Sequence, residues 1–273
     1  MGELSADTTA EIANGRILVA RDAGVGRITF NKPERMNAMS LDMWQGMHTA
    51  LDALADDAAI RVLVLTGAGG HAFVSGADIS EFDEVRATEE GVRHYNAISG
   101  AADRALAAFP KPTLAAIRGY CIGGGLGLAI GCDIRICTED SRFAIPAARL
   151  GLGYGLEPTR RLVRLVGPAS AAEILYTGAQ FGADAARAMG LVNRVVPPGE
   201  LDAVVDDMAA GIARNAPLTL AAAKAAIDAA ARPGDSEAEA RVAAMVGACY
   251  ASEDYAEGRR AFAEKRPPVF IGR

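Results

Sequence analysis

The chain has 273 residues, of which 51% are hydrophobic and 23% are charged, a composition typical of a soluble globular protein with a large core. Its 28 basic and 34 acidic residues give a formal net charge of −6, which argues against nucleic acid as a partner and leaves room only for a local basic pocket. No apolar run approaches the roughly 18 residues that a membrane span needs, so no membrane partner is expected.

The sequence predicts no metal site and a reducing compartment. Its cysteines form no CxxC pair and no cluster with a histidine at metal-ligand spacing, so we expect them to be small buried side chains. The first fifteen residues carry three acidic side chains and no apolar segment, unlike a secretory signal or a transit peptide. We therefore expect a cytoplasmic protein.

The chain is predicted to begin with an antiparallel hairpin and a helix. Residues 16–20 and 26–30 form two short apolar runs that flank a turn at residues 22–24. Ser40 is expected to cap a helix in which apolar side chains recur at helical spacing through residues 41–54.

From residue 61 onward, buried strands are predicted to alternate with helices. This alternation indicates right-handed βαβ crossovers, with ligand-facing loops at the carboxyl ends of the strands. The expected elements are strands at 61–65, 113–117 and 133–137, a glycine-rich loop at 67–78 and a helix at 88–108.

From about residue 201 only helical patterns follow one another, and alanine dominates them. Small apolar faces bury little area on their own, so we expect these helices to dock on another subunit. The expected helices cover residues 201–214, 218–231, 236–251 and 255–264. We therefore divide the chain into a core (residues 1–200) and a helical oligomerisation region (residues 201–273).

Glycines gather between the predicted strand at 113–117 and a helix that ends near Cys132. Four of them lie within residues 123–127, although each costs a helix about 1 kcal/mol relative to alanine. Close approach of an oxyanion or a phosphate to the bare main-chain amides would explain why glycines stand here despite this cost. Tight strand-to-helix packing is the alternative explanation.

A second loop, residues 72–79, also ends an apolar strand and opens a helical stretch. Two such loops can direct two amides at one point. Two fixed N–H donors stabilise the negative charge that develops on a thioester carbonyl oxygen in acyl-transfer or enolate chemistry. The two loops together predict an oxyanion hole.

At these motifs the chain resembles the crotonase superfamily, the enoyl-CoA hydratases and isomerases. The resemblance implies an α/β fold with a crotonase-like ββα spiral core, a helical C-terminal trimerisation region, and a homotrimer or dimer of trimers. It also implies an acyl-CoA substrate, with coenzyme A as part of the substrate and no separate cofactor. The matching segments are residues 31–38, 76–78, 119–125, 132–133, 143–152, 177–178, 185–195 and 262–270.

Carried over by position, the resemblance assigns the oxyanion-hole donors to the main-chain amides of Ala77 and Gly124. It implies that Phe262 and Lys265 reach the CoA of a neighbouring subunit, with a solvated helix face as the alternative for Lys265. The other residues that it assigns to CoA or substrate binding are Arg35, Met36 and Ala38 on one wall, Ser75, Gly76, Asp78 and Ile79 on the opposite one, and Tyr120, Ile122, Gly123, Pro146, Ala147 and Leu150. Asp78 is also expected to cap a helix.

The chain departs from the family at the two positions where hydratases carry glutamates. These positions are Gly127 and Ala147, and neither side chain can transfer a proton. A hydratase needs such groups because water loses a proton while the α-carbon gains one. An isomerase can work with a single base, but Ala147 replaces the carboxylate that most isomerases use.

Two nearby residues remain candidates for catalysis. Glu157 lies two positions beyond the acidic group of dienoyl-CoA isomerases and is a candidate base with a pKa raised by partial burial. The alternative is a carboxylate that complements the helix dipole or pairs with an arginine. Tyr154 matches a turn of methylmalonyl-CoA decarboxylases in which a tyrosine approaches the leaving carboxylate, and an ordinary half-buried aromatic is the alternative.

Three functions are therefore open. The first is a lyase or isomerase acting on an enoyl-CoA, with Glu157 or a bound small anion as the proton carrier. The second is a decarboxylase of a malonyl-type thioester, in which loss of CO2 generates the enolate without a base. The third is an acyl-CoA-binding protein without catalytic activity.

Overall fold

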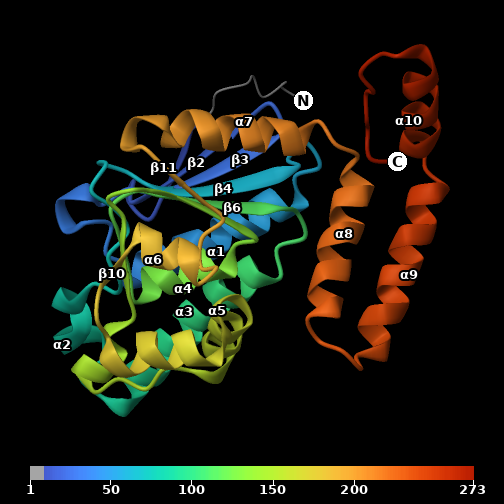
Figure 1. Cartoon of the computed structure of the whole chain (residues 1–273). Helices are drawn as coiled ribbons and strands as arrows, with labels where there is room; N and C mark the ends of the chain where they lie inside the picture. The colour runs from blue at the N-terminus through green and yellow to red at the C-terminus, as the bar shows by residue number, and fades with distance from the viewer. Residues whose placement is uncertain (1–8) are drawn as a thin grey trace.

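The computed structural model describes residues 9–273 and is built around a large mixed sheet (Figure 1). The strand order is β1-β2-β3-β4-β6-β8-β11, antiparallel from β1 to β3 and parallel from β3 to β11. The strands are Ala10–Ile12 (β1), Ile17–Asp22 (β2), Val25–Phe30 (β3), Val62–Gly67 (β4), Thr113–Ile117 (β6), Ile134–Thr138 (β8) and Arg194–Val196 (β11). The predicted hairpin and the predicted buried strands are confirmed.

A second, smaller sheet carries the two glycine-rich segments. Its order is β10-β9-β7-β5, in which β5, β7 and β9 are parallel and β10 is antiparallel to β9. The strands are Ala72–Val74 (β5), Tyr120–Ile122 (β7), Arg142–Ala144 (β9) and Phe181–Gly182 (β10). The sequence predicted β5 and β7 as parts of loops, because such short strands show no hydrophobic period.

Helices and short 3-10 turns connect the strands. In the first half of the chain they are Pro33–Arg35 (η1), Leu41–Asp56 (α1), Ile79–Glu81 (η2), Phe82–Val85 (α2), Glu89–Ala107 (α3) and Gly124–Gly131 (α4). In the second half they are Pro146–Leu150 (η3), Leu156–Thr177 (α5), Ala183–Ala188 (α6), Pro198–Glu200 (η4), Leu201–Ala213 (α7), Pro217–Ala230 (α8), Ser236–Tyr250 (α9) and Glu253–Glu264 (α10). Among the described helices, none is long and apolar enough to cross a lipid bilayer.

Side chains that alternate along the large sheet build two cores, one on each face. On one face, Leu63 and Leu65 join the main core, which also takes in α1, α3, α4 and the second sheet. On the other face, Val62 and Val64 pack against α7. Parallel strands that are buried on both faces appear in a sequence as continuous apolar runs, which is why these strands were predictable.

Helix α1 begins where the sequence predicts, but its cap differs. Ser40 occupies the N-cap position, yet its hydroxyl donates to the Asp42 carboxylate and caps no main-chain amide within residues 9–273. The Leu41 amide donates instead to Glu81 Oε2, at 3.1 Å. The start of α1 is thereby tied to the segment that follows the first predicted oxyanion loop.

The C-terminal helices form two groups. Helix α7 packs on the sheet, whereas α8, α9 and α10 stand beside the body (Figure 1). The helical region predicted from residue 201 thus leaves the body one helix later, at Pro217. The chain end folds back on α10, because the Asp254 carboxylate accepts hydrogen bonds from the amides of Ile271, at 2.7 Å, and Gly272, at 2.9 Å.

The contact between α4 and β5 gives a stability prediction. A Cβ atom on Gly125 would lie 2.1 Å from the carbonyl oxygen of Val74, so Gly125→Ala requires the backbone to shift. We expect this substitution to lower the free energy of unfolding by about 3 kcal/mol or more in urea denaturation. Gly199→Ala, which adds its methyl group to open space, is the control and should change it by less than about 0.5 kcal/mol. Equal stability of the two variants would contradict the packing argument.

Candidate active site

The two predicted oxyanion loops lie side by side at one edge of the second sheet. Strands β5 and β7 are parallel neighbours, so the loops that leave their carboxyl ends emerge together. Gly123 has a φ of 54°, which turns the chain from β7 into α4. A Cβ atom on Gly123 would lie 3.9 Å from Gly76 Cα, and one on Gly124 would lie 4.0 Å from the Ala77 nitrogen.

The structure leaves the amides of Ala77 and Gly124 available as donors. Met39 donates to the Gly76 carbonyl, at 2.8 Å, and accepts from the Asp78 amide, at 2.9 Å, so Ala77 between them turns its own N–H away from Met39. Gly124 is the first residue of α4, where an amide has no acceptor within the helix. Neither amide donates a hydrogen bond to any part of the chain that the structure describes. The two predicted donors are therefore neighbours at the positive end of a helix dipole.

The glycine cluster allows tight packing, which is one of the two roles that the sequence left open. A Cβ atom on Gly119 would lie 1.9 Å from the His71 carbonyl oxygen, and Gly125 is equally constrained by Val74. These two glycines allow close packing of β5 on β7 and α4. A Cβ atom on Gly124, in contrast, would make only ordinary contacts, the nearest at 3.4 Å from Trp44 Cζ2.

Asp78 holds the first loop in place. Its buried carboxylate accepts from Lys32 Nζ, at 2.6 Å, from the Ser80 amide, at 3.0 Å, and from the Ser80 hydroxyl, at 2.6 Å. Burial raises the pKa of Asp78, but the hydrogen bonds from Lys32 and Ser80 outweigh burial and hold the pKa below its ordinary value. The predicted helix cap is confirmed, and the carboxylate is engaged in a buried ion pair.

The turn at residues 35–38 is attached directly to this loop. The Ser75 amide donates to the Met36 carbonyl, at 3.1 Å, so the structure brings together the two segments that the resemblance puts on opposite walls. Arg35 and Met36 are exposed there, and Ala38 is buried. Sequence reasoning missed Asn37, whose buried side-chain amide donates to the carbonyls of Ala68 and Ala72 at 2.9 and 2.8 Å. A single polar residue in a turn gave no signal of that role.

The other predicted binding residues are only partly gathered at this edge. Pro146 lies beside Gly123, with its Cδ 4.0 Å from a Cβ built there, and Ala147 follows it in η3. Ile122 ends β7 at the same edge. Three further predicted residues have exposed side chains: Ile79, Tyr120 and Leu150. Of these, Tyr120 is at the amino end of β7, away from the loops.

Tyr154 occupies the space beside one missing glutamate. A Cβ atom on Gly127, which follows Gly124 by one helical turn, would lie 4.0 Å from Tyr154 Oη. This hydroxyl is buried and has no hydrogen-bond partner within residues 9–273. Burial raises the pKa of Tyr154, with Asp103 adding to the rise and Arg161 opposing it. Tyr154 is therefore a neutral phenol whose proton is not engaged by the protein.

Glu157 does not have the environment of a buried base. It lies in the first turn of α5 with 67% of its side chain exposed, and it pairs with Arg160. The expected partial burial is wrong, because the glycine-rich turn before α5 leaves the first turn of the helix at the surface. The alternative interpretation, a helix-terminal carboxylate paired with an arginine, is confirmed.

Phe262 and Lys265 lie at the end of α10, far from the two loops of their own chain (Figure 1). Phe262 is 87% exposed, and Lys265 ends the helix in a left-handed conformation with a φ of 54°. Their predicted contact with a neighbouring subunit's CoA stays a prediction.

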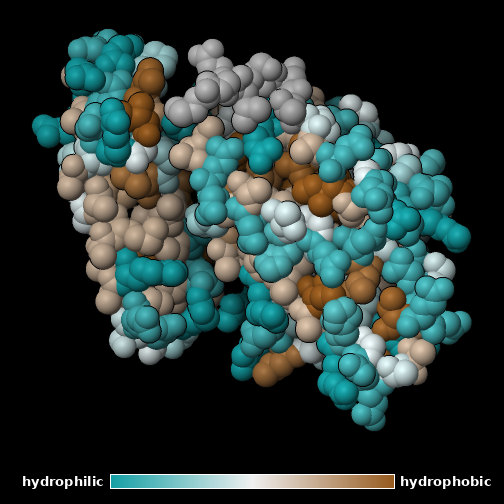
Figure 2. Space-filling view, turned by 180° about the vertical axis from the view of Figure 1, so that it is seen from behind, coloured by the Kyte–Doolittle hydropathy of each residue, from teal (hydrophilic) through white to brown (hydrophobic). Residues whose placement is uncertain are grey.

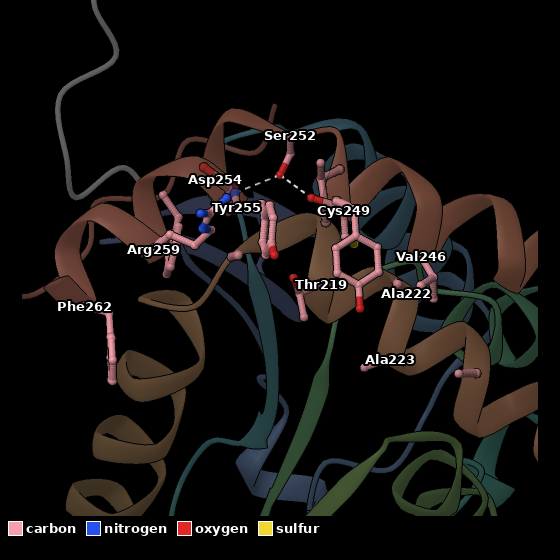
Figure 3. Close-up of a pocket in the computed structure, with 16 residues that line it drawn as sticks. Thr219, Ala222, Ala223, Val246, Cys249, Ser252, Asp254, Tyr255, Arg259 and Phe262 are labelled. Atoms are coloured by element: carbon pink, nitrogen blue, oxygen red, sulfur yellow. Dashed lines mark hydrogen bonds between the residues drawn. The ribbon is translucent and has the colours of Figure 1, made fainter.

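A groove with a volume of about 830 Å³ also lies at these C-terminal helices (Figure 3). Alanines of α8 line one side, and Tyr250 and Tyr255, whose rings meet edge to face with centroids 5.4 Å apart, line the other. Ser252 accepts from the Tyr255 amide and donates to the Cys249 carbonyl, so its hydroxyl is already satisfied. The groove is apolar and contains no part of the oxyanion loops.

No group of three or more metal-ligating side chains occurs within residues 9–273.

Comparison with known proteins gives one consistent result. The family model described as enoyl-CoA hydratase/isomerase matches residues 20–273. The crotonyl-CoA hydratase of Syntrophomonas wolfei is 36% identical over 262 residues, which are 96% of this chain and 100% of that protein. The short-chain-enoyl-CoA hydratase of Clostridium acetobutylicum is 36% identical over 92% of this chain and 95% of its own.

Solved structures of this family have the same fold as this chain. The enoyl-CoA hydratase of Bacillus anthracis has a TM-score of 0.89 at 32% identity and covers 94% of this chain and 100% of its own. An enoyl-CoA hydratase/carnithine racemase from Magnetospirillum magneticum has a TM-score of 0.86 at 39% identity over 94% of this chain and 96% of its own. The predicted α/β fold, with its crotonase-like core and C-terminal helices, is confirmed. With family model, sequence relatives and fold in agreement, the chain belongs to the enoyl-CoA hydratase/isomerase family of the crotonase superfamily.

Proposed function

We propose that this enzyme acts on an acyl-CoA thioester through an enolate, that the amides of Ala77 and Gly124 stabilise the enolate oxygen, and that Tyr154 delivers a proton to the α-carbon. The observation that carries the proposal is the buried, unpartnered Tyr154 hydroxyl beside Gly127. A neutral phenol whose pKa is raised is a proton donor at neutral pH and a poor base. Glu157, exposed and paired with Arg160, is not assigned a catalytic role.

Decarboxylation is the reaction that these groups complete without a base. The bond between the α-carbon and the carboxylate breaks, its electron pair passes into the thioester carbonyl, and CO2 leaves. Two amides hold the resulting enolate oxygen. Tyr154 then protonates the α-carbon and regains its proton from solvent.

Hydration of an enoyl-CoA is the second candidate, because two close relatives are named crotonyl-CoA hydratase and short-chain-enoyl-CoA hydratase. There Tyr154 would protonate the α-carbon after water adds to the β-carbon, and the proton of water would need an acceptor other than Gly127 and Ala147. Turnover of methylmalonyl-CoA but not crotonyl-CoA supports the first candidate, and the reverse supports the second. Tight binding of acyl-CoA without any turnover would leave the non-catalytic alternative.

We also propose that a second copy of the chain covers the groove between α8, α9 and α10, as in the expected homotrimer or dimer of trimers. Three large apolar side chains of this region are mostly exposed: Ile227 at 73%, Tyr250 at 66% and Phe262 at 87%. Seen from behind, the middle of the C-terminal helices presents a pale brown, apolar surface between teal residues at its two ends, whereas teal residues surround the apolar patches of the body (Figure 2). A cytoplasmic location remains a prediction from the sequence.

The oxyanion role predicts different outcomes for two substitutions at one position. Gly124→Pro removes the amide hydrogen at the first position of a helix, where proline is tolerated. Gly124→Ala keeps the hydrogen and adds only a methyl group at ordinary contact distance. We expect proline to reduce kcat by roughly 10²-fold or more and alanine by far less, in steady-state assays of folded variants. Similar rates for both variants would contradict the role of this amide.

Removal of the Tyr154 hydroxyl tests the proton donor. We expect Tyr154→Phe to lower kcat by roughly 10²-fold with little change in KM, since the phenol acts on the transition state. Glu157→Gln serves as the control and should leave kcat within about twofold. Because the pKa of Tyr154 is raised, wild-type activity that depends on the protonated phenol should persist to a pH above the ordinary tyrosine value of about 10. Full activity of Tyr154→Phe would remove Tyr154 from the mechanism.

The proposed assembly is tested by mass in solution. We expect light scattering to report a trimer or hexamer for the wild type, and Phe262→Glu combined with Tyr250→Glu to shift it toward monomer, because two charges would be buried at the interface. Arg93→Glu, on the exposed surface of α3, is the control and should leave the mass unchanged. A monomeric wild type would contradict the assembly.

A further inference from the structure

Arg86, which follows α2, is a cation held in a fixed position without a counter-charge. Its guanidinium carbon lies 4.2 Å from the centre of the Phe82 ring and 3.6 Å from that of the Tyr95 ring. Two aromatic rings thus hold the guanidinium in place through cation–π contacts. No carboxylate lies within 4.0 Å of Arg86 in the part of the chain that the structure describes, although the segment around it is acidic.

The neighbouring acidic groups are engaged elsewhere or exposed. Glu81 accepts a hydrogen bond from the Leu41 amide, at 3.1 Å, and thereby caps α1. Asp83 and Glu84 are exposed on α2. Within residues 9–273, Arg86 Nε is enclosed and has no hydrogen-bond partner. The guanidinium is therefore a cation without an ion-pair partner in the part of the chain that the structure describes.

Contacts connect Arg86 to the oxyanion donors. The hydroxyl of Tyr95, whose ring lies beneath the guanidinium, accepts from Trp44 Nε1 at 2.9 Å. Trp44 Cζ2 in turn lies 3.4 Å from a Cβ atom built on Gly124. Both aromatic side chains are buried, with exposures of 5% for Trp44 and 4% for Tyr95. Two aromatic side chains therefore separate the cation from the amide that is proposed to hold the thioester oxygen.

We infer that Arg86 is a specificity-determining residue that binds a carboxylate at the far end of the acyl group, so that the preferred substrates are acyl-CoAs whose acyl chain ends in a carboxylate. A guanidinium fork binds a carboxylate through two parallel hydrogen bonds, and holding the guanidinium in place lowers the entropic cost of that pairing. The inference rests on the proposed acyl-CoA site but not on which reaction the site performs. A carboxylate so far from Gly124 is distinct from the group that a decarboxylation removes.

The experiment compares two saturated acyl-CoAs of equal chain length by calorimetry: glutaryl-CoA, which ends in a carboxylate, and pentanoyl-CoA, which ends in a methyl group. We expect the wild type to bind glutaryl-CoA at least about tenfold more tightly, and Arg86→Gln to lose this preference while keeping its affinity for pentanoyl-CoA. Arg86→Lys keeps the charge without the fork and should keep part of the preference. Arg93→Gln, an exposed arginine of α3 paired with Glu89, is the control and should behave as the wild type.

The outcomes separate this inference from the proposed function. No preference in the wild type, or an equal loss of affinity for both ligands in Arg86→Gln, would overturn the role of Arg86, the latter by indicating a packing role. Binding of neither ligand would overturn the acyl-CoA site and this inference together. A preference that depends on Arg86, without turnover of any substrate, would overturn only the proposed chemistry. Should Arg86→Gln fail to fold by circular dichroism, a reduced preference in Arg86→Lys decides the question.

Discussion

Close approach of two parallel strands, β5 and β7, is the constraint on which the candidate site depends. The strands are three residues long, so their position is fixed less by their own hydrogen bonds than by what packs around them. Gly119 and Gly125 permit that packing, because a side chain at either position would meet a carbonyl oxygen of the β5 segment. The buried Lys32–Asp78 ion pair then fixes the loop that follows β5. Main-chain atoms, rather than reactive side chains, thereby acquire a precise mutual position.

A site built from main-chain amides can keep its binding function while its reaction changes. The amides of Ala77 and Gly124 depend on backbone geometry, whereas proton transfer depends on side chains that line the same space. At Gly127 the loss of a side chain leaves room for the Tyr154 hydroxyl, which approaches from the turn before α5. A phenol and a carboxylate differ in charge and in pKa by several units, so this exchange alters which step can be catalysed without altering the fold. Arg86 extends the same logic to the acyl chain, since one fixed cation selects among substrates that share the thioester.

The sequence predicted the parts of the structure that leave a periodic or glycine signal. The strands from Val62 and Thr113 were predictable because both of their faces are buried, and the loop before α4 was predictable because glycines recur at a helix start. Strands β5 and β7 were not, since three residues carry no period. Burial also decided one question that the sequence left open, because Glu157 is exposed and pairs with Arg160. The cluster of Trp44, Tyr95 and Arg86 joins residues up to 51 positions apart, and no local pattern marks it.

A crystal structure with acetoacetyl-CoA bound tests the central claim most directly, namely that two amides from two loops hold one thioester oxygen. The account predicts that this oxygen lies about 2.7–3.1 Å from the nitrogens of both Ala77 and Gly124. It also predicts that the Tyr154 hydroxyl faces the α-carbon. A thioester oxygen bound by other groups, or in contact with only one of the two amides, would contradict the account.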